Sequence, residues 1–443
     1  MRSKMFKQFL PFALLLFPLG AHAVMEESKL TDRPESKADD PHLIAPGLKW
    51  TLNFRGRYED QMNFRFGGSS AANNDNFYTL RMRPGLQWDP NPQWSLTFEG
   101  QVATVRGSDA INEKATPNNF EENLDLHIAS AEYKGDRFRA KIGRQKINYA
   151  NQRLLGSGEW LNTSRVLDAA KISFGDPKGS SWDFIAAKPV AVNPRDWNDH
   201  HETGNRYFNS ALYGAIFNSA SLISGGSFSA HYLLRDNDLN DDSVSTVGLV
   251  ASKTNGQISY DGELNYQFGT FAGADHRAMA AHAGIKYQAR DRQKTALNAM
   301  FNWASGDDDP TDGTHGTFDN LYPTNHMHYG EMDFFAWMNM KNFEVGVTQV
   351  YNKLTVRAAY HWFWLDHPST DAWYSAGGSV LRAGVAGASS FVGNELDLVL
   401  RYTHDDSLNW ALGYCHFFPG GFVDDTGPNR PAKFLYFMIN WKL

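Results

Sequence analysis

The chain has 443 residues, a formal net charge of −7 and a single cysteine, Cys415. One cysteine excludes an internal disulfide and a multi-cysteine metal site, and the chain has no basic tract that would indicate a nucleic-acid partner. After residue 24 no apolar run reaches the roughly 18 residues that a membrane-spanning helix requires. The mean hydropathy of −0.48 is still compatible with membrane strands, because each apolar residue of such a strand alternates with a polar one.

The first residues have the pattern of a secretory signal peptide. Three basic residues precede the apolar run 9–19 and the small-x-small site Ala21-His22-Ala23. We therefore expect residues 1–23 to be a signal peptide that is cleaved after Ala23. Residues 24–46 are polar and contain proline, which predicts a flexible periplasmic leader that is too short to form the plug domain of an energised transporter.

From about residue 50 onward the chain repeats a pattern of period two. Leu52, Phe54 and Tyr58 share one face of the first such segment, whereas Arg55 and Arg57 lie on the other. A helix would mix these two sets around its surface, so the pattern predicts strands. About eighteen strands follow from it, at 50–64, 77–88, 93–105, 124–133, 137–148, 164–174, 182–192, 206–219, 226–235, 246–253, 256–269, 276–289, 294–304, 340–351, 353–364, 394–405, 408–418 and 434–443.

The connections between these strands alternate between short and long. Short segments with turn chemistry, such as Asn255-Gly256 and Tyr351-Asn-Lys353, alternate with connections at 106–123, 148–163, 193–205, 305–339, 365–393 and 419–433. Short periplasmic turns and longer extracellular loops are typical of outer-membrane barrels.

The last ten residues, 434–443, are rich in aromatic residues and alternate strictly. Leu435, Phe437 and Trp441 share a face, and Tyr436 and Asn440 lie on the other. In a closed barrel this strand would pair with the first one, so no edge would remain exposed. We therefore predict an all-β protein: a single closed antiparallel transmembrane β-barrel of about 18 strands, formed by residues 47–443 and located in the outer membrane of a Gram-negative cell, with outer-membrane lipid around it.

The faces opposite the apolar ones carry many charges and would line the lumen. The basic residues are Arg55, Arg57, Arg81, Arg83, Arg139, Lys141, Lys171, Arg357 and Arg401, and the acidic ones are Glu59, Glu99, Asp183, Glu344 and Asp397. Two interpretations remain open at this point. The charges form a constriction that selects anionic solutes, or they form structural ion pairs in a wet lumen without solute preference.

Three segments resemble the alginate export family of outer-membrane proteins. They are Gly143–Asp168, which contains Gly143-Arg-Gln-Lys-Ile-Asn-Tyr149, then Gly313–Asp333, and the short strand Thr79-Leu-Arg-Met-Arg-Pro-Gly85. The resemblance covers essentially the whole chain from about residue 50 onward. It implies an eighteen-strand barrel whose arginine-lined lumen passes an anionic polyuronate such as alginate, and it implies a periplasmic delivery protein as a partner.

The family resemblance places Arg144, Arg153 and Arg165 in its motif, as candidate lumen residues. Strict alternation would point Arg144 outward, in phase with Phe138 and Ile142, unless a bulge intervenes. With the strand charges, the full set of predicted substrate-binding residues is Arg57, Arg81, Arg83, Arg144, Arg153, Arg165, Lys171, Arg357 and Arg401. The predicted function is passive transport of an anionic saccharide, and the alternative is a porin for small organic acids or other solutes.

Other signals are weaker. The acidic segment 307–312 lacks the spacing of an EF-hand loop and fits a solvated loop better than a calcium site, and His315, His326 and His328 fit an ordinary polar loop better than a metal site. No Gly-x-Ser-x-Gly elbow or other nucleophile pattern indicates an enzyme such as a lipid hydrolase. We therefore predict no catalytic residue, no metal site and no cofactor.

Overall fold

The computed structural model describes residues 42–67, 73–112, 115–176, 179–199, 206–237 and 239–443, and the expected signal peptide lies outside them. Eighteen of the strands in these residues form one closed antiparallel barrel. They are β2 (Leu48–Met62), β3 (Asn74–Asn91), β4 (Trp94–Arg106), β5 (Glu122–Lys134), β6 (Phe138–Gln145), β7 (Leu167–Gly175), β8 (Ser180–Pro189), β9 (Ala211–Ser219), β10 (Gly226–Asn237), β11 (Asp242–Asn255), β12 (Ile258–Phe271), β13 (Ala274–Gln288), β14 (Ala296–Ala304), β16 (Met340–Tyr351), β17 (Leu354–Leu365), β20 (Phe391–Thr403), β21 (Leu408–Pro419) and β22 (Ala432–Lys442).

The barrel closes between its first and last strands. β2 pairs with β22 from Asn53 opposite Lys442 to Met62 opposite Lys433. Phe54 lies opposite Trp441 and Tyr58 opposite Phe437, so the aromatic face of the terminal strand continues directly onto β2. The predicted number of strands, their order and the closure by residues 434–443 are therefore confirmed.

The alternation in the sequence corresponds to two physically different faces. Along β3, Tyr78, Leu80 and Met82 are exposed, whereas Arg81 and Arg83 between them are buried. The same outer face carries exposed aromatic residues on strand after strand, which matches a lipid-facing belt with the charged residues turned inward. No helix in the described residues is both long and apolar enough to cross a membrane.

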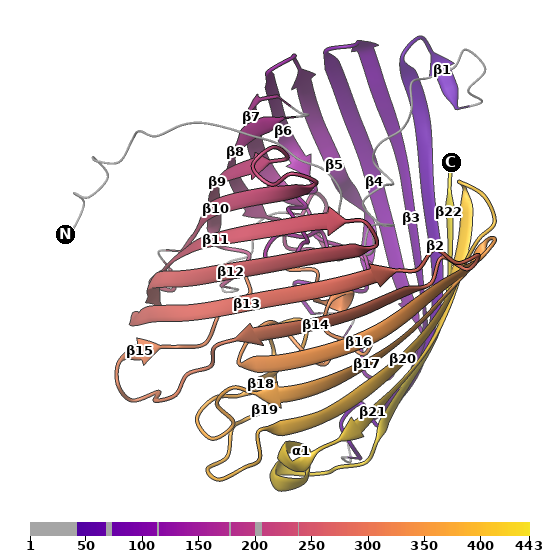
Figure 1. Cartoon of the computed structure of the whole chain (residues 1–443). Coiled ribbons are helices and arrows are strands. Elements are labelled where there is room, and N and C mark those ends of the chain that lie inside the picture. Colours follow the sequence, from indigo (N-terminus) through magenta and orange to yellow (C-terminus); the bar gives the residue numbers. More distant parts are fainter. Residues whose placement is uncertain (1–41, 68–72, 113–114, 177–178, 200–205, 238) are drawn as a thin grey trace.

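The two ends of the barrel differ. β1 (Leu43–Ala45), which falls within the expected leader and pairs with β2, lies with the C-terminus at one end, and the helix α1 (Gly421–Thr426) lies with the small strands β15 (Thr314–His315), β18 (Trp373–Tyr374) and β19 (Val380–Arg382) at the other (Figure 1). The turn after β11 shows how short connections form at the end that holds β1 and the C-terminus. Gly256 has a φ of +62°, which a two-residue hairpin favours.

The long-loop end is uneven. The connections β10–β11 and β12–β13 occupy only residues 238–241 and 272–273, although they lie at this end. The other connections at this end are much longer, and two of them, 146–166 and 305–339, turn into the barrel.

Candidate functional site

Two long connections meet inside the barrel. The first, residues 146–166 between β6 and β7, and the second, residues 305–339 between β14 and β16, are called here the first and second inward loops. The Gly156 amide donates to the Tyr322 carbonyl at 2.8 Å, and the Tyr322 amide donates to the Leu154 carbonyl at 2.9 Å. Trp160 stacks on His326 with ring centroids 3.8 Å apart. The loops therefore form one layer across the lumen.

The first inward loop is held by arginines of β2 and β3. Arg57 donates to the Trp160 carbonyl at 2.6 Å and lies 3.9 Å from the centre of the Trp160 ring, which is a cation–π geometry. Arg55 donates to the Leu161 carbonyl at 2.8 Å, and Arg83 donates to the Thr163 carbonyl at 3.1 Å. These side chains point inward because they alternate with the lipid-facing residues of the same strands.

Glu159 is the charged partner within the first inward loop. Its carboxylate lies 2.9 Å from Arg83, 3.2 Å from Arg81 and 2.7 Å from Lys146. Burial alone would raise the pKa of the Glu159 carboxyl, but Arg83, Lys146 and Arg81 outweigh it and hold the pKa well below its usual value. Glu159 is therefore ionised and fixes the loop against β3 by charge.

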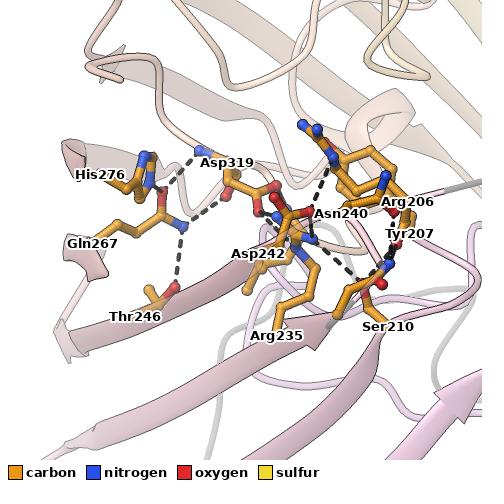
Figure 2. A network of polar contacts seen from close by, with 12 residues as sticks. Arg206, Tyr207, Ser210, Arg235, Asn240, Asp242, Thr246, Gln267, His276 and Asp319 are labelled. Carbon is orange, nitrogen blue, oxygen red and sulfur yellow. Dashed lines mark hydrogen bonds and ion pairs between the residues drawn. The ribbon is translucent and has the colours of Figure 1, made fainter. Parts of the chain in front are cut away.

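The second inward loop is held on the opposite wall, in the polar network of Figure 2. Asp319 lies between Arg235 of β10 and Gln267 of β12: its carboxylate is 2.7 Å from Arg235, and its backbone amide donates to Gln267 at 2.8 Å. Arg235 also contacts Asp242, at 3.0 Å. Burial would raise the pKa of Asp319, but Arg235 outweighs it and lowers the pKa.

A second charged group of this loop surrounds His326. Its imidazole lies 3.2 Å from Asp333 and 3.4 Å from Glu331. Burial alone would lower the pKa of His326, but the two carboxylates outweigh it and raise the pKa to about 10. Glu331 also lies 3.7 Å from Arg357 of β17, so the protonated histidine belongs to a network that reaches the barrel wall.

The short-turn half of the lumen has a different character. Here basic side chains in the inward-facing phase remain accessible: Lys141, Lys171, Lys286, Arg357 and Arg401, with Arg139 at the rim. The accessible acids of this wall among the described residues are Asp89, Glu99, Glu132 and Asp261. A solute that reaches the inward loops from this side therefore passes more basic than acidic side chains.

The model of the alginate export family matches residues 47–436. This chain belongs to the alginate export family. No curated protein sequence matches the chain significantly.

The fold is similar to solved structures of Pseudomonas aeruginosa proteins. OccK11 (OpdR) has 14% identity and a TM-score of 0.59 over 89% of this chain and 96% of its own. OccK5 (OpdH) has 13% identity and a TM-score of 0.59 over 90% and 98%, and OccK8 (OprE) has 11% identity and a TM-score of 0.61 over 90% and 98%. At these identities the likeness concerns the fold. Together with the family, it shows an outer-membrane β-barrel channel.

The structure assigns most of the arginines predicted from the family resemblance and the strand pattern to holding the inward loops. Arg57, Arg81 and Arg83 hold the first inward loop, as described above. Arg165 also holds the loops, because it donates to the Gly156 and Pro323 carbonyls at 2.7 and 3.0 Å. Arg153 is buried and donates to the Tyr329 hydroxyl at 3.1 Å. These residues are brought together around the loops and have little surface left for a solute.

Arg144 lies apart from this group. It is in the phase of Ile142, which is exposed on the outer face, and its guanidinium binds Asp168 of β7 at 2.9 and 3.1 Å. It also donates to the Asp199 carbonyl at 2.6 Å. The outward direction of Arg144 therefore agrees with strict alternation and not with the lumen position that its place in the family motif implies.

Lys171, Arg357 and Arg401 are the predicted residues that stay accessible in the lumen, although Lys171 forms an ion pair with Asp183 at 3.0 Å and Arg357 forms one with Glu344 at 2.9 Å. Lys286 is a basic lumen residue that the sequence analysis omitted. The signal was present, because Lys286 alternates with the outward-facing Ile285 and Tyr287 of β13.

The three histidines of the second inward loop do not share a site. His315 contacts His276 at 3.0 Å, His326 contacts Asp333, and His328 contacts the Asn151 carbonyl at 2.8 Å.

Proposed function

We propose that this protein passes anionic saccharides, polyuronates such as alginate, through its lumen by diffusion. The observation that carries the proposal is the basic wall formed by Lys141, Lys171, Lys286, Arg357 and Arg401 on the short-turn side of the inward loops. Fixed cationic groups raise the local concentration of an anion and lower the barrier to its entry. The family supports the same class of solute.

The inward loops determine how large a solute can be. Their contacts at Tyr322, Leu154 and Trp160 join them across the lumen, so an extended polymer would require these contacts to open. This observation favours a second candidate, a porin for small organic acids that passes the loops without displacing them. The two candidates share anion selectivity and differ in the size of the solute.

The test is single-channel conductance of the purified protein in a planar bilayer under a salt gradient. We expect an anion-selective reversal potential and reversible block by an added oligouronate. Selectivity with block by a monouronate only would support the small-acid porin. Cation selectivity would contradict both candidates.

Variants locate the selectivity. Lys171→Gln and Lys286→Gln should each shift the reversal potential toward zero, because the first leaves Asp183, the ion-pair partner of Lys171 at 3.0 Å, uncompensated and the second removes a lumen cation. The matched control is Lys253→Gln, which removes an exposed lysine of β11 in the outward-facing phase, opposite Tyr260, and should leave the potential unchanged. An equal shift in the control would assign the effect to surface charge.

A further inference from the structure

Three carboxylates converge at the long-loop end, away from the lumen layer. Glu122 and Asp125 lie at the start of β5, and Asp199 lies in the connection between β8 and β9. Each offers an oxygen atom, all within 4.8 Å of one another, and all three residues are buried. The cluster therefore joins two segments that are more than seventy residues apart in the sequence, as the contact between Asp125 and Asn198 shows.

Two of the carboxylates are already oriented by backbone amides. Asp125 accepts from the amides of Asn198 and Asp199, both at 2.7 Å, and Asp199 accepts from the amide of Asn193 at 2.8 Å. These bonds fix the curve of residues 193–199 and turn the carboxylates toward a common point. A site organised in this way exists before a ligand arrives, which reduces the entropy lost on binding.

Glu122 is different, because both of its oxygens are buried and neither accepts a hydrogen bond of ordinary geometry; its polar neighbours are the Asp199 carboxylate and the Asn123 backbone. Its side chain is almost fully buried, with 3% of the residue exposed, and it faces Asp199. An ionised carboxylate in this position is unfavourable without a positive partner. The guanidinium of Arg144 binds Asp168 and the Asp199 carbonyl instead of the Glu122 carboxylate, and Arg106 and Arg195 line the same groove as Glu122.

The chemistry of the cluster selects the kind of ligand. All of its donors are carboxylate oxygens, which favours a hard cation. Ca²⁺ accepts irregular shells made of protein carboxylates, whereas Mg²⁺ demands near-ideal octahedral geometry and usually keeps several waters. An open groove lined by Thr104, Arg106, Glu122, Pro194 and Arg195 lies beside the cluster.

We propose that Glu122, Asp125 and Asp199 form a calcium site that ties residues 193–199 to the start of β5. The bound ion gives the buried Glu122 carboxylate a positive partner and neutralises the like charges of the three carboxylates. The alternative is a proton shared between Glu122 and Asp199, which needs no metal and predicts no saturable binding of a cation.

The experiment is a titration of the whole folded barrel, purified without lipopolysaccharide, with Tb³⁺ as the luminescent substitute for Ca²⁺. Trp197 is two residues from Asp199 and should sensitise the Tb³⁺ emission. We expect saturable emission that Ca²⁺ displaces at a concentration of about 10⁻⁴ to 10⁻³ M, the range of extracellular calcium modules. Trp197→Phe should lose most of the emission.

Ligand variants complete the test. Glu122→Gln and Asp199→Asn should each weaken displacement by Ca²⁺ about tenfold or more, because affinity follows the charge count of the ligands. Asp196→Asn is the matched control, since Asp196 is an exposed acid of the same segment that binds the Asn193 side chain. Folding of each variant is checked by the heat-dependent shift of its band in gel electrophoresis.

The outcomes decide between the two readings of the cluster. Absence of saturable emission, or emission that Ca²⁺ does not displace, would overturn the calcium site, as would wild-type affinity in Glu122→Gln. Emission that persists in Trp197→Phe would place the ion elsewhere and would overturn it as well. This last comparison needs no ligand variant, so it stands even if Glu122→Gln fails to fold.

Discussion

The contact between Asp319 and Arg235 offers the sharpest test of how the second inward loop is held. Both side chains are fully buried, and Asp319 accepts two contacts from the guanidinium, at 2.7 and 2.8 Å. In Asp319→Asn the shape and the bond from the Leu321 amide are retained, but the charge is lost. Removing one partner of a buried ion pair costs about 3–5 kcal/mol, because the other charge is left uncompensated.

The expected loss is near the lower end of that range. Arg235 keeps Asp242 at 3.0 Å, so the guanidinium is not left alone. We therefore expect the free energy of unfolding to fall by about 3 kcal/mol, measured by guanidinium titration in detergent with tryptophan fluorescence. In the variant, the Arg235 guanidinium loses one of its two carboxylate partners, so the second inward loop is held less firmly against the wall. We therefore expect this loop to leave its place more often and to cause larger current fluctuations in the single-channel record.

The control is Asp308→Asn, which changes an exposed acid of the same loop and should have no effect on either measurement. A loss of less than about 1 kcal/mol in Asp319→Asn, the size of a surface ion pair, together with a wild-type current record, would refute the view that this contact holds the loop.

Three further predictions concern single residues. The pKa of His326 is raised to about 10 in the folded protein from an ordinary 6.5, so its contribution to loop stability is complete below pH 6.5 and is lost as the pH rises through 10; proteolysis of residues 305–339 should accelerate over this window in the wild type and show no such step in His326→Gln. Glu159→Gln should destabilise the barrel by about 2–3 kcal/mol, since the surrounding basic side chains lose their counter-charge, and an unchanged unfolding midpoint would contradict the proposed role of Glu159. In Gly248→Ala the new Cβ would lie 2.1 Å from the Asn265 amide oxygen, and we expect a loss of about 1–3 kcal/mol in the same titration, whereas Gly262→Ala, whose nearest atom is 3.5 Å away, should behave as wild type.

The strands could be predicted from the sequence because their signal is local. Alternation between lipid and lumen is imposed on each strand separately, and an even number of strands lets the first and last strands close the barrel as an antiparallel pair. The phase of each residue also came from this rule. It describes Arg144 and could have identified Lys286.

The arrangement of the inward loops could not be predicted in this way. Residues 146–166 have no periodicity, and their partners Arg55 and Arg57 are about a hundred residues away in the chain, as the separations of 106 and 103 show. An arginine that binds a loop and one that faces a solute have the same pattern in the strand. The calcium cluster was missed for the same reason, because Asp199 is separated from Asp125 by 74 positions.

The arginines of β2 and β3 bind the first inward loop largely through its main chain. The acceptors are the carbonyl oxygens of Trp160, Leu161 and Thr163. A carbonyl oxygen is present whatever side chain the residue carries, so Leu161 and Thr163 can be exchanged without losing these anchors. The barrel thus separates the position of its constriction from the chemistry displayed there, which leaves the solute preference free to diverge among related channels while the scaffold stays the same.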